Sequence, residues 1–173
     1  MDVKQHLLER GLNPSLYNCS WDEETAAFIL FNLSGQLAGY QQYRPFAPKS
    51  FPNNPKLGRY YTYAKDKIAV WGMETYNWNS SLLFVAEGIF DACKLHNQGM
   101  SAIAVLSNDP QKLRGWLFAL PRTIVTICDN DKAGKKLAKM GQMSYNTPSG
   151  KDLGDMSDSE VEAFLSTSMG IIK

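Results

Sequence analysis

Residues 82–92, LLFVAEGIFDA, decide the fold of this chain. An unbroken apolar run ends in an acid, Glu87, and residues 89–98 then have helical character up to Gly99. The same rhythm returns in SAIAVLS (101–107) before residues 110–120, and in RTIVTICD (122–129) before residues 131–142. Continuous apolar runs that alternate with helices predict an α/β fold, a mostly parallel sheet with helices on both faces.

The first half of the chain has a different pattern. FILFNL (28–33) and QLAGYQQYRP (36–45) flank Ser34-Gly35, which predicts a β-hairpin. We expect a short helix over 3–10 and a loop over 46–58, and we expect short strands over 59–63 and 68–73. Residues 77–81 are polar. They predict a boundary between a small basic α+β subdomain (1–80) and a second domain (81–173).

Composition excludes several classes of protein. The chain has 173 residues, a net charge of +1 and 44% hydrophobic residues, as expected for a globular protein. Its three cysteines are far apart and contain no CxxC pair, so a zinc ribbon is excluded and Cys93 and Cys128 are expected to be buried thiols. The N-terminus has no apolar signal region and no run is long enough to span a bilayer. We expect a cytoplasmic protein of a bacterial or phage-infected cell, with no membrane partner.

Acidic residues follow two of the three apolar runs. Glu87 ends the first, with Asp91 shortly after it, and Asp129-Asn130-Asp131 ends the third. Sites in open α/β sheets form beyond the carboxyl ends of the strands, so these carboxylates are expected to converge. Crowded carboxylates repel one another, and Mg²⁺ or Mn²⁺ relieves that repulsion. Two such ions suit phosphoryl transfer. Taken alone, either aspartate of the DxD pair is also typical of a helix N-cap.

Three segments in the right order resemble the TOPRIM domain of primases, topoisomerases and several nucleases. They are FVAEGIFDA, TICDNDKAG and GKDLGD, and they fall within residues 82–156. The resemblance implies that Glu87, Asp129 and Asp131 are catalytic and hold the magnesium. Asp91 and Asp152 match accessory metal positions, and Lys151 matches an accessory position that contacts nucleic acid or nucleotide.

The first half resembles the small subdomain that precedes TOPRIM in the catalytic core of bacterial and phage DNA primases. FILFNLSGQLAGYQQYRP, NPKLGRYYTY and IAVWGMETY match it in order and spacing. The resemblance implies that Arg44, Lys56 and Arg59 face template and nucleotide. Lys132 begins a basic cluster after the DxD pair that is typical of a solvated helix face, and Lys132 itself is close enough in sequence to reach a phosphate. Tyrosines interleave with these cations, a combination that suits single-stranded nucleic acid. Ser107-Asn108-Asp109 stands where primases carry a turn rich in serine and glycine.

Three functions remain open at this stage. The first is a primase-like nucleotidyltransferase that synthesises RNA primers on single-stranded DNA from nucleoside triphosphates, with a replicative helicase or another replisome protein as a partner. The second is a TOPRIM nuclease in which Asp91 or Asp109 acts as a general base. The third is a non-catalytic module that binds DNA or the replisome. His6 and His96 have no neighbours at ligand spacing, and no triad, zincin or P-loop motif is present.

Overall fold

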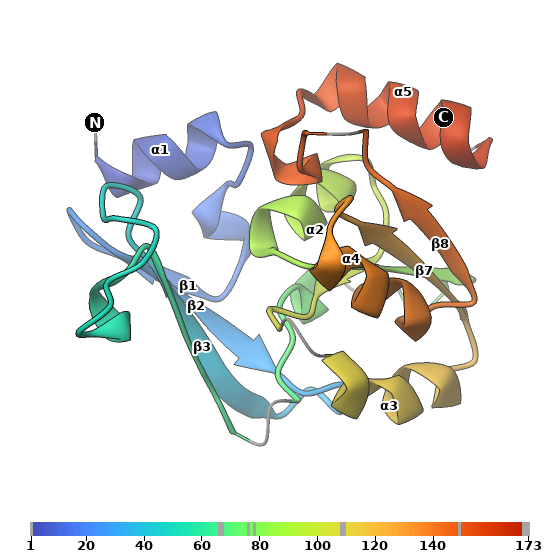
Figure 1. Ribbon diagram of the computed structural model, residues 1–173, viewed down its shortest axis with the longest axis horizontal. Helices are drawn as coiled ribbons and strands as arrows, with labels where there is room; N and C mark the ends of the chain where they lie inside the picture. The colour runs from blue at the N-terminus through green and yellow to red at the C-terminus, as the bar shows by residue number, and fades with distance from the viewer. Residues whose placement is uncertain are drawn as a thin grey trace.

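The structure is a computed structural model that describes residues 2–65, 68–75, 77, 79–107, 110–148 and 150–170. It has two four-stranded sheets, one antiparallel in the order β1-β2-β3-β4 and one parallel in the order β6-β5-β7-β8 (Figure 1). The strands are β1 (Cys19–Trp21), β2 (Ala26–Phe31), β3 (Leu37–Tyr43), β4 (Tyr60–Ala64), β5 (Leu82–Ala86), β6 (Ala102–Ala104), β7 (Thr123–Cys128) and β8 (Met143–Asn146). The helices are α1 (Val3–Glu9), α2 (Ile89–Asn97), α3 (Arg114–Ala119), α4 (Lys132–Leu137) and α5 (Asp158–Met169).

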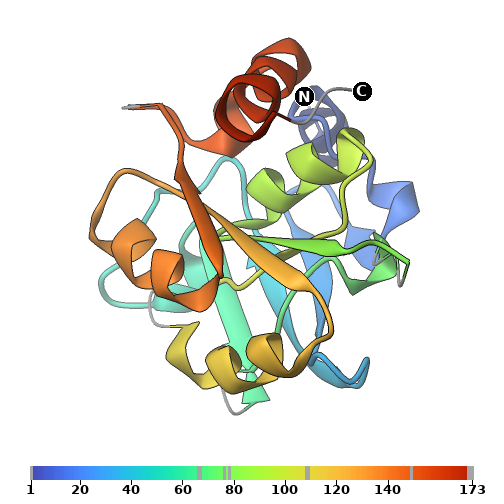
Figure 2. The same cartoon turned by 90° about the vertical axis from the view of Figure 1, so that its right-hand side faces the viewer.

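The parallel sheet confirms the predicted α/β class. β5 lies at its centre, with Phe84 paired to Ala102 of β6 on one side and to Val125 of β7 on the other. β5 and β7 are almost entirely buried because helices cover both faces. Helices α2 and α5 pack on one face and α3 and α4 on the other (Figure 2).

The antiparallel sheet contains the predicted hairpin. Asn32 closes its turn, since its side-chain oxygen accepts the amides of Ser34 and Gln36. Gly35 has φ +77°, a conformation that glycine adopts without a steric penalty. β2 alternates strictly, so Phe28 and Leu30 enter the core.

Residues 68–71 join the two sheets. The predicted strand over 68–73 is present only as two isolated bridges, from Val70 to Phe31 and from Trp71 to Ala104. Trp71 is fully buried, and its ring lies 4.6 Å from that of Tyr17. One hydrophobic core contains residues from both sheets, so the boundary at residues 80 and 81 stays a prediction.

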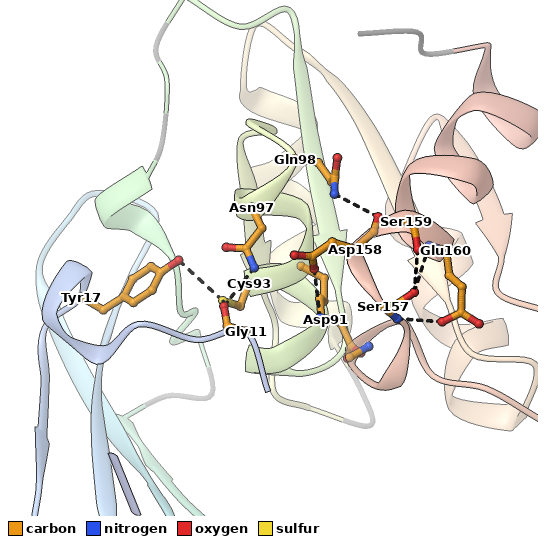
Figure 3. A network of polar contacts seen from close by, with 12 residues as sticks. Gly11, Tyr17, Asp91, Cys93, Asn97, Gln98, Ser157, Asp158, Ser159 and Glu160 are labelled. Carbon is orange, nitrogen blue, oxygen red and sulfur yellow. Dashed lines mark hydrogen bonds and ion pairs between the residues drawn. The ribbon is translucent and has the colours of Figure 1, made fainter. Parts of the chain in front are cut away.

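Helix α2 is held from both sides (Figure 3). Asn97 Nδ2 and Cys93 Sγ both donate to the carbonyl of Gly11, at 2.9 and 3.4 Å. On the other side, Gln98 Nε2 donates to the carbonyl of Asp158 at the start of α5. α5 itself begins with the predicted capping box of Ser157 and Glu160. These contacts fix the C-terminal half of α2, while its N-terminal end follows Glu87 at the acidic site.

Several boundaries differ from the expectations. β1 and β8 were not predicted, because they are short, largely exposed edge strands without an apolar run. The helices expected over 110–120 and 131–142 are shorter than expected and include 3-10 turns at Pro110–Leu113 and Ala138–Met140. Cys93 and Cys128 are buried as predicted. Among the described residues, no helix has the length and apolar character needed to cross a membrane.

Candidate active site

The predicted acids meet at the carboxyl ends of β5 and β7. Glu87 directly follows β5 and Asp129 directly follows β7, and these strands are paired in parallel. They open into a cavity of about 260 Å³. Its lining includes Glu87, Asp91, Asp129 and Asp152 together with Arg10, Gln41, Tyr60, Leu106 and Gly154. The cavity therefore lies between the parallel sheet and the inner face of the antiparallel one.

The carboxyl groups of Glu87 and Asp129 both have raised pKa values. Burial, followed by repulsion from Asp129 and Asp131, raises the pKa of Glu87 to about 7. Burial, followed by repulsion from Asp91 and Asp152, raises the pKa of Asp129 to about 7. Within the described part of the chain, the buried Oε1 of Glu87 has no hydrogen-bond partner. A buried carboxylate oxygen without a donor requires an explanation, and a bound cation supplies one.

Asp91 has a structural task in this arrangement. Its Oδ2 accepts the amide of Gly88 at 2.9 Å, and its Oδ1 accepts the amide of Gly154 at 2.7 Å. A Cβ on Gly88 would lie 2.9 Å from Oδ2, and one on Gly154 would lie 3.0 Å from Oδ1. Gly88 therefore leaves room for the Asp91 carboxylate. Burial raises the pKa of Asp91 to about 6 against the opposing effect of these two amides.

Asp131 caps helix α4. Its Oδ1 accepts the amide of Gly134 at 2.8 Å, which is the N-cap role that the sequence left open. Gly134 is packed tightly, because a Cβ there would lie 1.9 Å from the carbonyl oxygen of Asp129. The glycine of the DNDKAG segment thus lets α4 begin directly against the end of β7. Asp131 is exposed and does not line the first cavity.

A second cavity of about 340 Å³ lies on the other side of Asp129. Its lining consists of Lys49, Asp129, Asn130, Asp131, Thr147, Pro148, Gly150, Lys151 and Asp152. Asp129 and Asp152 line both cavities, so the two are adjacent. Lys151 forms an ion pair with Glu160 at 2.6 Å.

The other predicted cations have different positions. Arg44 donates to the carbonyl of Lys56, and Arg59 donates to the carbonyl of Ala47, so both guanidinium groups brace the loop between β3 and β4. The Lys56 amine lies over the ring of Tyr61, 5.8 Å from its centroid. Lys132 is exposed at the start of α4 and lines neither cavity.

Arg10 was not identified from the sequence. It follows α1, and its guanidinium carbon lies 3.7 Å from the centroid of the Phe90 ring while Nη2 pairs with Asp155 at 2.8 Å. Among the described residues that line the first cavity, Arg10 is the one cation, together with Glu87 and Asp129. The only sequence signal was an arginine at the end of a predicted helix. The contact itself joins residues 145 positions apart.

The donor set suits a magnesium ion that relies on few protein ligands. Among the residues that the structure describes, no three or more histidine, cysteine, aspartate or glutamate side chains are arranged so that they could hold a metal ion. Mg²⁺ usually binds one or two carboxylates and completes its shell with water and substrate phosphates. Glu87, with its unpaired buried oxygen, and Asp129 fit that mode. Asp109, the alternative general base, lies outside the described residues.

No protein-family description matches the sequence, and no curated protein sequence matches it. Solved structures do match. The E. coli primase catalytic core has a TM-score of 0.65 at 16% identity, covering 97% of this chain and 61% of that one. The DnaG primase catalytic domain bound to ssDNA has a TM-score of 0.60 at 18% identity, and the match covers 92% of this chain and 56% of that one. The RNA polymerase domain of Mycobacterium tuberculosis DnaG with double-stranded DNA has a TM-score of 0.63 at 14% identity, with coverages of 94% and 72%.

This chain therefore spans 56% of the length of one of these structures, 61% of another and 72% of the third. The likeness extends over both sheets, since at least 92% of this chain is covered in each comparison. It matches the architecture predicted from the acidic segments and the hairpin. The chain has the fold of a DNA primase catalytic core.

Proposed function

We propose that the protein is a primase-like nucleotidyltransferase that joins ribonucleotides on a single-stranded DNA template in a metal-dependent reaction. One observation carries the proposal. Glu87 and Asp129 share a cavity with Arg10 at the meeting point of the two sheets, and the Oε1 atom of Glu87 is buried there with no partner among the described residues. Carboxylates and an arginine that face one space suit a polyanionic substrate bound through divalent cations.

Glu87 and Asp129 would hold the metal, and Asp131 and Asp152 lie near enough to add to its electrostatic environment. Bound there, Mg²⁺ or Mn²⁺ would neutralise the phosphates and activate the attacking hydroxyl. Asp91 keeps its hydrogen bonds from the amides of Gly88 and Gly154, and through the second it positions the loop that carries Asp152. That task argues against Asp91 as the general base of a nuclease, because its two oxygens are already engaged.

Arg10 would contact a phosphate within the same cavity. Its stacking on Phe90 and its ion pair with Asp155 hold the guanidinium in place before substrate arrives. Preorganised cations lose less freedom on binding than mobile ones, so such a contact adds to affinity.

The tyrosines divide between the two faces of the antiparallel sheet. Tyr43 and Tyr60 stack on the inner side at 4.9 Å, and Tyr60 lines the first cavity. Tyr40 stacks on Tyr63 at 5.6 Å and lies 6.3 Å from Tyr61, on the opposite face. We assign template contact to the inner side, where Tyr60 borders the acidic cavity and an unpaired base would stack near the reacting groups.

The test is primer synthesis on single-stranded DNA with ribonucleoside triphosphates and Mg²⁺ or Mn²⁺. Asp129→Asn and Glu87→Gln are expected to reduce product by at least about a hundredfold, because each removes a charge that would hold the metal. Glu162→Gln, an exposed acid on α5, is the matched control and should leave activity unchanged. The proposal fails if the wild type forms no product, with or without a replicative helicase, or if both acid variants retain full activity.

One observation favours a second candidate, a non-catalytic nucleic-acid-binding module. No preformed group of three donor side chains exists within the described residues. Isothermal titration of Mn²⁺ separates the two functions, since the enzyme requires binding that Glu87→Gln weakens. Single-stranded DNA binding without Mn²⁺ binding would support the module and reject both the nucleotidyltransferase and the nuclease.

A further inference from the structure

Residues 44–59, which we call the Lys49 arm, form a closed loop between β3 and β4. The Arg44 amide donates to the carbonyl of Arg59 at 2.8 Å, and the Arg59 amide donates to that of Pro48 at 2.8 Å. The side chains of the same two arginines add bonds to the carbonyls of Lys56 and Ala47, at 2.6 and 3.2 Å. The guanidinium groups of Arg44 and Arg59, which were expected to face template and nucleotide, therefore hold the arm itself.

The arm is also packed internally. A Cβ on Gly58 would lie 3.3 Å from the carbonyl oxygen of Pro55 and 3.6 Å from that of Lys49. Asn54 caps the short turn at Pro55–Leu57 by accepting the amide of Lys56. Prolines at positions 45, 48, 52 and 55 restrict the backbone further. The arm is thus held in a defined conformation.

Lys49 directly follows Pro48, whose carbonyl accepts the Arg59 amide, so it lies near the base of this arm. Its side chain is exposed and lines the second cavity, whose other described lining residues belong to the parallel-sheet half. Asp129, Asp131 and Lys151 are among the other residues that line this cavity. Between residues 2 and 170, as far as they are described, the Lys49 amine makes no hydrogen bond or ion pair. Lys151, in contrast, is paired with Glu160.

We propose that Lys49 binds the phosphate tail of the incoming nucleoside triphosphate, an inference that rests on the proposed function. A triphosphate and the carboxylates of Glu87 and Asp129 together carry more negative charge than two divalent cations neutralise. The outer phosphates of the triphosphate then need cationic side chains on the side away from the acids. Lys49 meets that need from the arm, and the cavity of about 340 Å³ beside Asp129 gives the tail room.

If Lys49 has only a structural role, the expected effects on Mn²⁺ and triphosphate binding are different. If the amine only balanced the charge of Asp129 and Asp131, it would compete with a divalent cation. Removing it would then strengthen Mn²⁺ binding and leave the preference for triphosphate over monophosphate unchanged. If Lys49 binds the phosphates, removing its amine instead lowers the affinity for triphosphate and leaves the binding of Mn²⁺ alone unchanged.

The experiment uses the full chain with Lys49→Gln, Lys49→Arg and the control Lys65→Gln, which lies on the outer face of the antiparallel sheet. Titrations follow Mn²⁺ alone, Mn²⁺-GTP and Mn²⁺-GMP. Lys49→Gln should weaken Mn²⁺-GTP binding roughly fivefold and change Mn²⁺-GMP binding by less than about twofold. Lys49→Arg should restore GTP affinity to within about twofold, and the Lys49→Gln deficit should shrink at high salt.

The outcomes separate the two proposals. Wild-type protein that binds neither Mn²⁺ nor Mn²⁺-GTP overturns the proposed function, and the Lys49 inference with it. Wild-type binding of both, with equal GTP affinity in Lys49→Gln, overturns the Lys49 inference alone. Tighter Mn²⁺ binding in Lys49→Gln with unchanged GTP affinity assigns the lysine to charge balance and also overturns it.

Discussion

Glu87 allows the electrostatics of the site to be tested without any assay of activity. Its pKa is raised from 4.5 to about 7 by burial and by neighbouring carboxylates. An acid whose pKa is higher in the folded than in the unfolded chain destabilises the fold once it is charged. The stability of the metal-free protein is therefore expected to fall as the pH rises from about 4.5 to about 7.

Glu87→Gln removes that charge and should stabilise the metal-free protein by about 1 kcal/mol near pH 8, since solvent screens part of the repulsion. The gain should be smaller near pH 5, where wild-type Glu87 is protonated in the folded chain. Urea denaturation in chelator at both pH values measures it, with Glu162→Gln as the control. Mn²⁺ should then stabilise the wild type more than the variant. An equal loss of stability in Glu87→Gln at both pH values would contradict this account.

At the same scale, the sequence predicted the acids better than it predicted their partners. Parallel pairing follows from the apolar runs, so the approach of Glu87 to Asp129 could be foreseen. The bond from the Gly154 amide to Asp91 joins residues 63 positions apart, and no local pattern indicates it. Arg10 and Lys49 likewise reach the site from the first half of the chain, through contacts that only the assembled fold creates.

The start of helix α4 is the element whose geometry the site depends on most directly. Gly134→Ala would place a Cβ 1.9 Å from a backbone oxygen of Asp129, so the helix has to move away from β7. We expect a loss of at least about 2 kcal/mol in stability, together with weaker Mn²⁺ binding.

Gly115→Ala in helix α3 is the matched control, because a Cβ there meets no atom of a described residue within 4 Å. It should leave Mn²⁺ binding intact and stabilise the protein by up to about 1 kcal/mol through helix propensity. Thermal unfolding and Mn²⁺ titration of both variants measure these effects. Equal behaviour of the two alanines would show that the approach of α4 to Asp129 does not matter.

Element types were predictable where burial dictated them. β5 and β7 are covered on both faces, so their sequences are continuously apolar and identify them as strands. Residues 68–73 are equally apolar, yet they cross between two sheets and pair only at Val70 and Trp71. A buried segment without a long partner strand has the same apolar sequence pattern as a strand. The strand predicted over 68–73 is therefore reduced to two isolated bridges.

At the scale of the whole molecule, the shared core bears on the proposed division at residues 80 and 81. Phe28 of the antiparallel sheet packs edge-on against Trp71, with ring centroids 6.2 Å apart, and Trp71 is bridged to β6 of the parallel sheet. Trp71, Phe28 and Phe84 belong to one cluster of buried side chains. We therefore expect the two sheets to unfold as one cooperative unit even if they are described as subdomains.

Native-state hydrogen exchange tests this expectation. The most protected amides of β2 and β5 should open with the same free energy, within about 1 kcal/mol. Phe28→Leu, a core change in the antiparallel sheet alone, should lower both values equally, by about 1 kcal/mol. If the β5 amides keep their wild-type protection in Phe28→Leu, the sheets are separate folding units. The cavity between them would then open and close as the halves move, rather than being fixed by a common core.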